Sequence, residues 1–319
     1  MDQENKSVWN YRTAENGVTV RNIVIPTEKG GDDIEILQLS DLHFNFFDQR
    51  DLEEANPALM STYEYRKWLA GGAAVSKVVK CLEHCKSVDM IVITGDILDS
   101  LSHGNVTLAK EYIFEPYAGR VMASLGNHEI SRRVQGTVKD SSTLESRLEI
   151  VSANWCNDIY YSSKILGDKV MLIQMDNASQ YDEKQLSFWD HQIEPLSRDL
   201  ALARKNGYVV LLFFHCNLSS GNPKDASVHV DMLGAKNNEY CDFYNYYAKP
   251  ESEGAAGVIY NLIVNNGDII KGCFCGHHHG DFYTEILAKT PDGNDTVIPQ
   301  YSMIGSIYGE GHVLKITVK

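Results

Sequence analysis

The sequence lacks any long hydrophobic run. Its longest apolar stretches, such as residues 209–214, are far shorter than the roughly 20 residues needed to cross a bilayer, so we expect no membrane segment. Residues 1–10 are polar and contain no basic segment followed by an apolar one, which gives no sign of a secretory leader. These absences predict a cytoplasmic protein that makes no membrane contact.

Basic residues are scarce relative to acidic ones. The chain has 29 Lys and Arg against 43 Asp and Glu, which gives a formal net charge of -14. Affinity for nucleic acid comes largely from Lys and Arg that displace counterions, so this balance disfavours DNA or RNA as a partner. Small anionic substrates stay open, and bound divalent cations would add positive charge that the count omits. A nuclease is therefore kept as an alternative.

Cysteines are few and irregularly spaced. The seven cysteines form no Cys-x-x-Cys pair, which disfavours a zinc knuckle or a disulfide scaffold and predicts free buried thiols. With 43% hydrophobic and 23% charged residues, the chain of 319 residues has the composition of a soluble globular protein. We expect one domain over residues 1–319, with insertions near 45–70 and 216–255.

Short β-branched runs alternate with helical patterns through most of the chain, which predicts an α/β fold. The expected core strands are residues 34–40, 90–94, 121–125, 170–175, 209–214 and 269–275. The expected helices are residues 72–85, 142–151, 184–205 and 254–264. Beyond Gly280, consecutive strands separated by turn residues indicate a second sheet near the C-terminus.

Potential metal ligands follow nearly every one of these hydrophobic runs. In chain order they are Asp41 and His43, Asp96 and Asp99, Asn127 and His128, His215, and finally His277 and His279. In open α/β sheets ligands bind beyond the carboxyl ends of the strands, so these side chains are expected to meet in one crevice.

The spacing of these residues suits metal binding. Asp41 and His43 are two positions apart, like His277 and His279, so on extended backbone each pair would project to the same side. A mixture of carboxylate, imidazole and amide donors suits Mn, Fe or Zn better than Ca. Glycines that would permit tight turns and close approach of the backbone stand beside the ligands, at Gly95, Gly126 and Gly276.

The ordered motifs resemble the signature of calcineurin-like metallophosphoesterases. They are Asp-x-His, Gly-Asp-x-x-Asp, Gly-Asn-His-Glu, a single His after an apolar strand, and Gly-His-x-His, spread from Asp41 to His279. The resemblance implies a four-layer αββα sandwich, with two mixed β-sheets flanked by helices and two divalent metal ions at one edge. It assigns one ion to Asp41, His43, Asp96 and His279, and the other to Asp96, Asn127, His215 and His277.

The resemblance also implies catalytic roles for two further residues. His128 matches the family residue that contacts the phosphate and protonates the leaving oxygen, and Asp99 would orient its imidazole through a carboxylate contact. Two simpler alternatives stay open, namely that His128 only binds phosphate and that Asp99 only caps a turn.

Two positions at which this sequence differs from particular subfamilies narrow the activity that we expect. Purple acid phosphatases carry Tyr where this chain has Asp99, and Ser/Thr protein phosphatases carry Arg where it has Ser100. The Phe213-Phe214-His215 element is more similar to bacterial cyclic-nucleotide-type phosphodiesterases and their acid-phosphatase-like relatives. We therefore expect a hydrolase of phosphomonoesters or phosphodiesters that uses hydroxide activated by two metal ions. A scaffold on the same fold that has lost catalysis is the alternative from another class.

Overall fold

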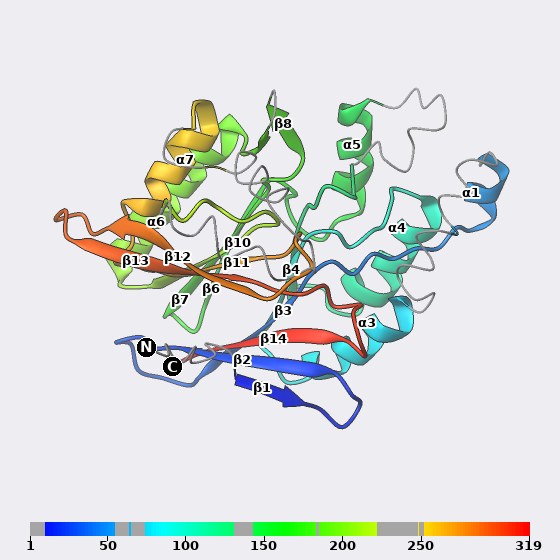
Figure 1. Ribbon diagram of the computed structural model, residues 1–319, viewed down its shortest axis with the longest axis horizontal. Coiled ribbons are helices and arrows are strands. Elements are labelled where there is room, and N and C mark those ends of the chain that lie inside the picture. The colour runs from blue at the N-terminus through cyan, green and yellow to red at the C-terminus, as the bar shows by residue number, and fades with distance from the viewer. Residues whose placement is uncertain are drawn as a thin grey trace, which may run out of the picture.

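Two six-stranded β-sheets lie face to face in the computed structural model (Figure 1), which describes residues 10–54, 64, 74–130, 143–182, 185–221, 248 and 252–319. The first sheet has the order β1-β2-β14-β3-β4-β5 and the second has the order β12-β13-β11-β10-β7-β6. Each contains parallel and antiparallel neighbours, so both are mixed, as predicted.

The bounds of the elements follow the chain from end to end. The strands of the first sheet are β1 Asn10–Thr13, β2 Thr19–Ile25, β3 Ile34–Leu39, β4 Met90–Thr94, β5 Val121–Ser124 and β14 His312–Val318. Those of the second are β6 Tyr161–Leu166, β7 Val170–Met175, β10 Val209–Phe213, β11 Ile270–Cys275, β12 Phe282–Lys289 and β13 Asp295–Ser302. A short hairpin is formed by β8 Gln180–Asp182 and β9 Gln185–Ser187. The α-helices are α1 Gln49–Glu54, α3 Ala74–Leu82, α4 His103–Ala109, α5 Leu144–Asn154, α6 Ile193–Asn206 and α7 Gly254–Val264.

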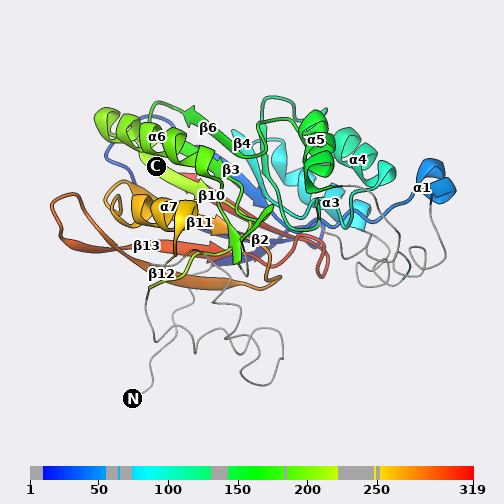
Figure 2. The same ribbon diagram turned by 90° about the horizontal axis from the view of Figure 1, so that it is seen from above.

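Three buried hydrophobic layers separate the four structural layers. Because side chains of a strand alternate between its two faces, Leu37 and Leu39 of β3 pack with α3 and α5, while Ile34 and Ile36 pack between the sheets. The outer face of the second sheet is covered by α6 and α7, and Figure 2 shows these two helices on the opposite side of the molecule from α3, α4 and α5. The predicted αββα sandwich is confirmed.

The helix ends follow local sequence rules. Thr143 caps α5, since its side chain accepts a hydrogen bond from the backbone N–H of Ser146. Gly207 ends α6 in a left-handed conformation with a φ of 69°. No helix among the described residues is long and apolar enough to cross a membrane.

Two sequence predictions of secondary structure were wrong in part. The helix expected over residues 184–205 begins only at Ile193, because Phe188 is buried in the core and the indole of Trp189 donates to Asp176. The strands expected after Gly280 also divide between the sheets. The first two form the edge of the second sheet, whereas β14 inserts between β2 and β3 of the first.

Parts of two predictions lie outside the described residues. They include most of the expected insertions, namely residues 55–63, 65–70, 222–247 and 249–251, and the seventh cysteine, Cys241. The single-domain organisation stays a prediction. The six cysteines of the described segments are free thiols.

Candidate metal centre

The metal ligands that the sequence predicts come together where the strands of both sheets end. Asp41 and His43 follow β3, and Asp96 follows β4, in the first sheet. His215 follows β10, and the residues from His277 to His279 follow β11, in the second sheet. Backbone hydrogen bonds tie these loops together, since Asp41 N donates to Gly95 O and Gly276 N donates to His215 O. The site therefore lies across the seam between the two sheets.

Five of the predicted ligands have a left-handed backbone. The φ angles are 52° at Asp41, 42° at His43, 52° at Asp96, 70° at His277 and 50° at His279. Non-glycine residues avoid this region, and such strain persists where the surrounding structure enforces it, commonly at functional sites. The expectation that extended backbone aligns Asp41 with His43, and His277 with His279, was wrong. Left-handed turns beyond the strand ends direct these side chains into the site.

The three glycines beside the ligands are required by close packing. A side-chain carbon at Gly95 would lie 2.6 Å from His215 Nδ1. At Gly126 it would overlap Asp96, and at Gly276 it would overlap Ser40 and Asp41. A side chain at any of these three positions would displace a predicted ligand, while close approach of the backbone to an ion stays a prediction.

One group of donor atoms surrounds Asp41. Its Oδ1 lies 3.1 Å from His279 Nε2 and 3.9 Å from His43 Nε2, and the two imidazole nitrogens are 3.0 Å apart. Ser40 Oγ holds the other carboxylate oxygen of Asp41 at 2.6 Å, which leaves Oδ1 directed at the histidines. Asp41, His43, Asp96 and His279 thus form the first predicted ligand set.

A second group of donor atoms surrounds His215. Its Nε2 lies 3.1 Å from His277 Nδ1, 3.3 Å from Asn127 Oδ1 and 3.3 Å from Asp96 Oδ2. Asp96 Oδ2 is also 3.9 Å from His43 Nε2 in the first group. The backbone N–H of His128 donates to the other oxygen, Asp96 Oδ1, at 2.8 Å. One oxygen of Asp96 therefore faces both groups.

The residues present fit a cation, because in the neutral form of His215 the lone pair of Nε2 points at carboxylate and amide oxygens. His215 Nδ1 lies 2.7 Å from the carbonyl oxygen of Thr94, which can only accept, so Nδ1 carries the proton in the neutral ring. Nε2 is then an unprotonated nitrogen that points at the oxygens of Asn127 and Asp96. A divalent ion bound by these atoms would remove the mutual repulsion.

The pKa shifts in the site indicate a demand for positive charge. Burial lowers the pKa of His215, but the Asp96 carboxylate, with Asp41 and the Thr94 carbonyl, outweighs burial and raises this pKa to about 10. Burial raises the pKa of Asp41, but the imidazoles of His279 and His215 outweigh it and lower the value to about 2. Burial also raises the pKa of Asp96, but the imidazoles of His215 and His128 outweigh burial and hold this pKa well below its usual value. The carboxylates of Asp41 and Asp96 therefore stay ionised.

His128 reaches the same site, but its contact with Asp99 differs from the prediction. Its Nδ1 lies 2.9 Å from the backbone carbonyl oxygen of Asp99, which accepts the proton. The Asp99 carboxylate is 3.5 Å from His128 Nδ1 and closer, at 3.2 Å, to His43 Nδ1. The backbone carbonyl thus sets the tautomer of His128, and the carboxylate of Asp99 contacts a predicted metal ligand.

A family model of calcineurin-like phosphoesterases matches residues 34–281, which contain all nine predicted site residues. The chain belongs to the calcineurin-like phosphoesterase family. This membership supports a metal-dependent phosphoesterase, with the substrate left to the shape of the pocket.

Individual solved structures match this phosphoesterase less well than the family model does. A dimetal phosphatase from Danio rerio is 11% identical with a TM-score of 0.46, and the match covers 85% of this chain and 87% of that one. A purple acid phosphatase from yellow lupin (Lupinus luteus) seeds is 13% identical with a TM-score of 0.43 over 96% of this chain and 48% of that one. The chain therefore spans about half the length of the lupin enzyme. No curated protein sequence matches significantly.

Several residues that support the site of this phosphoesterase were missed in the sequence. The Asn177 side chain both donates to and accepts from the backbone of Cys216, and so holds the turn after His215. The Cys216 thiol lies within 4.8 Å of donor atoms of His215 and His277, and burial raises its pKa well above the usual value. Tyr308 contacts His279. Asn177 follows β7 after a single residue, Asp176, and this position at a strand end is the sequence signal that could have identified it as a site residue.

Glu129, the last residue of the Gly-Asn-His-Glu motif, connects two ligand loops. Its fully buried carboxylate accepts backbone N–H bonds from Gly126 at 2.6 Å, Leu98 at 2.8 Å and Asp96 at 3.1 Å. Burial and the charge of Asp96 raise the pKa of Glu129 to about 8, while the N–H donors oppose this rise. Glu129 therefore fixes the loops that carry Asp96 and Asn127.

We expect Glu129→Gln to destabilise the metal-loaded protein by about 2 kcal/mol. Both carboxylate oxygens of Glu129 accept from N–H donors, so either orientation of the amide directs an NH₂ group at a donor that loses its partner. Urea unfolding measures the change, with the exposed Glu149→Gln as the matched control. Equal midpoints for the two variants would contradict the connecting role.

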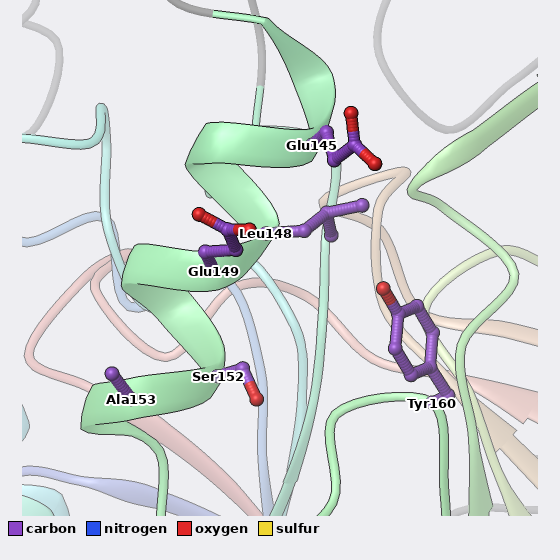
Figure 3. Close-up of a pocket in the computed structure, with 6 residues that line it drawn as sticks. All are labelled: Glu145, Leu148, Glu149, Ser152, Ala153 and Tyr160. Carbon is purple, nitrogen blue, oxygen red and sulfur yellow. The ribbon is translucent and has the colours of Figure 1, made fainter.

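A cavity of about 370 Å³ lies between α5 and Tyr160 (Figure 3). None of the nine predicted site residues lines it. The carboxylates of Glu145 and Glu149 stand on its helical wall, where they would repel a phosphate. This cavity is not suited to the ester group.

Proposed function

We propose that the chain hydrolyses phosphomonoesters or phosphodiesters at a dinuclear metal centre. The observation that carries the proposal is the position of Asp96 Oδ2, which lies 3.3 Å from His215 Nε2 in one donor group and 3.9 Å from His43 Nε2 in the other. A carboxylate oxygen in that position suits a bridging ligand of two ions.

The donors divide into the two sets that the sequence motifs imply. Asp41, His43, Asp96 and His279 would hold one ion, and Asp96, Asn127, His215 and His277 would hold the other. Two such ions, when bound, neutralise phosphate charge and supply an activated water at neutral pH. Nitrogen and oxygen donors of this kind suit Mn, Fe or Zn.

The protein's own side chains orient the site and supply a proton. The Asp99 carbonyl fixes the Nδ1 proton of His128, so its Nε2 faces the site, 4.0 Å from Asp96 Oδ2. In its imidazolium form, His128 would donate the Nε2 proton to the leaving oxygen of the ester. Asp99 contacts His43 Nδ1 and would direct the other nitrogen of that ring to the metal.

The test is hydrolysis of p-nitrophenyl phosphate and bis-p-nitrophenyl phosphate by chelator-stripped protein that is re-supplied with Mn, Fe, Zn or Ni. We expect at least one metal to restore turnover, and the preferred ester to separate monoesterase from diesterase activity. Binding of two ions without turnover of either ester, or of a panel of natural phosphate esters, would favour the scaffold without catalysis.

A further inference from the structure

Tyr308 lies against the donor group of Asp41, beyond the segment that the family model matches. It precedes β14, the red strand of Figure 1, in the sequence, whereas the match ends at residue 281. Its phenol oxygen is 2.7 Å from His279 Nδ1, and the two rings lie 5.3 Å apart. No sequence motif included this residue.

The hydrogen bond bears on which nitrogen of His279 is open to a metal. His279 Nε2 points at Asp41 Oδ1, 3.1 Å away, and at His43 Nε2, 3.0 Å away. An imidazole nitrogen binds a cation only without its proton, so the ring proton of bound His279 has to reside on Nδ1. There the oxygen of Tyr308 accepts it, which fixes both the tautomer and the direction of the ring.

The segment that carries Tyr308 contacts the same donor group at other points. Ser306 N donates to Ser40 O at 2.8 Å, beside Asp41. Ile304 N donates at 2.8 Å to the carboxylate of Asp281, which the buried Arg21 also binds. These contacts hold the loop in which His279 adopts its left-handed backbone. Each of these contacts reaches the loop of Asp41 or the loop of His279, which carry ligands of the same donor group.

We propose that Tyr308 is a positioning residue that sets the affinity of one metal site, the one formed by Asp41, His43 and His279. It acts through the Nδ1 proton of His279, and the His215 site is independent of it. The inference rests on the proposed dinuclear centre, since it concerns the metals that this centre would bind.

The test is the Tyr308→Phe variant, which keeps the ring and removes only the oxygen. Chelator-stripped protein is titrated with Mn by calorimetry, and we expect one of two sites to bind about 10- to 100-fold more weakly while the other is unchanged. At two equivalents of Mn, the electron paramagnetic resonance signal of a spin-coupled pair should give way to that of an isolated ion. Excess Mn should restore both.

The matched control is Tyr161→Phe. Its hydroxyl donates at 3.0 Å to Asp199 of α6, outside the donor groups, so this variant should lose some stability and keep both affinities. Unchanged binding in Tyr308→Phe, or equal weakening of both sites, would overturn the proposal. Because the readout is metal binding, it is independent of turnover: failure of every ester in the wild-type protein would reject the hydrolase and leave this result standing.

Discussion

The Asp96→Asn variant is expected to lose metal-dependent hydrolysis by roughly three orders of magnitude or more. The asparagine oxygen would be drawn to the backbone N–H of His128, which holds Asp96 Oδ1 at 2.8 Å. The amide NH₂ would then replace Oδ2 and face His215 and His43, where it can bind neither ion. Loss of the buried negative charge weakens cation binding further.

Metal analysis and turnover are measured together on this variant. We expect fewer than two tightly bound ions, with no metal restoring the wild-type rate. The matched control is Asp295→Asn on β13, whose side chain is 93% exposed and lies outside the donor groups. Retention of two ions with turnover within tenfold of wild type would show that Asp96 does not bridge.

His128→Gln is expected to lower kcat by about 10²- to 10³-fold on alkyl phosphate esters, with its metal content unchanged. His128 is the site imidazole with a proton fixed by a backbone carbonyl and a side chain that is 15% exposed, so it can reach a substrate. Loss of a general acid matters most when the leaving oxygen is basic. The loss should therefore be smaller on p-nitrophenyl esters, whose leaving group needs little protonation.

Comparing the two esters separates this role from phosphate binding. His191→Gln serves as the control, since His191 is exposed and stacks on Trp189 outside the donor groups. An equal rise in KM for both esters with kcat unchanged would indicate that His128 only binds the phosphate.

The donor set was accessible from the sequence because each ligand follows a recognisable buried strand. Ligands bind beyond the carboxyl ends of strands, so the order of the motifs predicted a common crevice for Asp41, Asp96 and His215, although β10 lies in the other sheet from β3 and β4. The reason given for the paired spacing was nevertheless wrong. Left-handed backbone at Asp41 and His279 depends on the enclosing loops, and a periodicity argument contains no information about those loops.

The residues that support the metal ligands could not be predicted from local sequence patterns. Arg21 and Asp281 are 260 positions apart, and their ion pair becomes visible only when the first sheet lies beside the loop after β11. Tyr308 belongs to no motif and is recognised by one hydrogen bond. The start of α6 at Ile193 was missed because tertiary contacts of Phe188 and Trp189 override helical propensity.

Because the donors follow strands of two different sheets, bound metal ions would stabilise the folded state against unfolding. His43 and His279 are 236 positions apart, so an ion held by both closes a very long loop that the unfolded chain cannot maintain. Each bound ion is in effect a reversible cross-link, and mass action makes its strength depend on the concentration of free metal. A low concentration of free metal in the cell would thereby shorten the lifetime of the folded protein as well as remove the activity of its site.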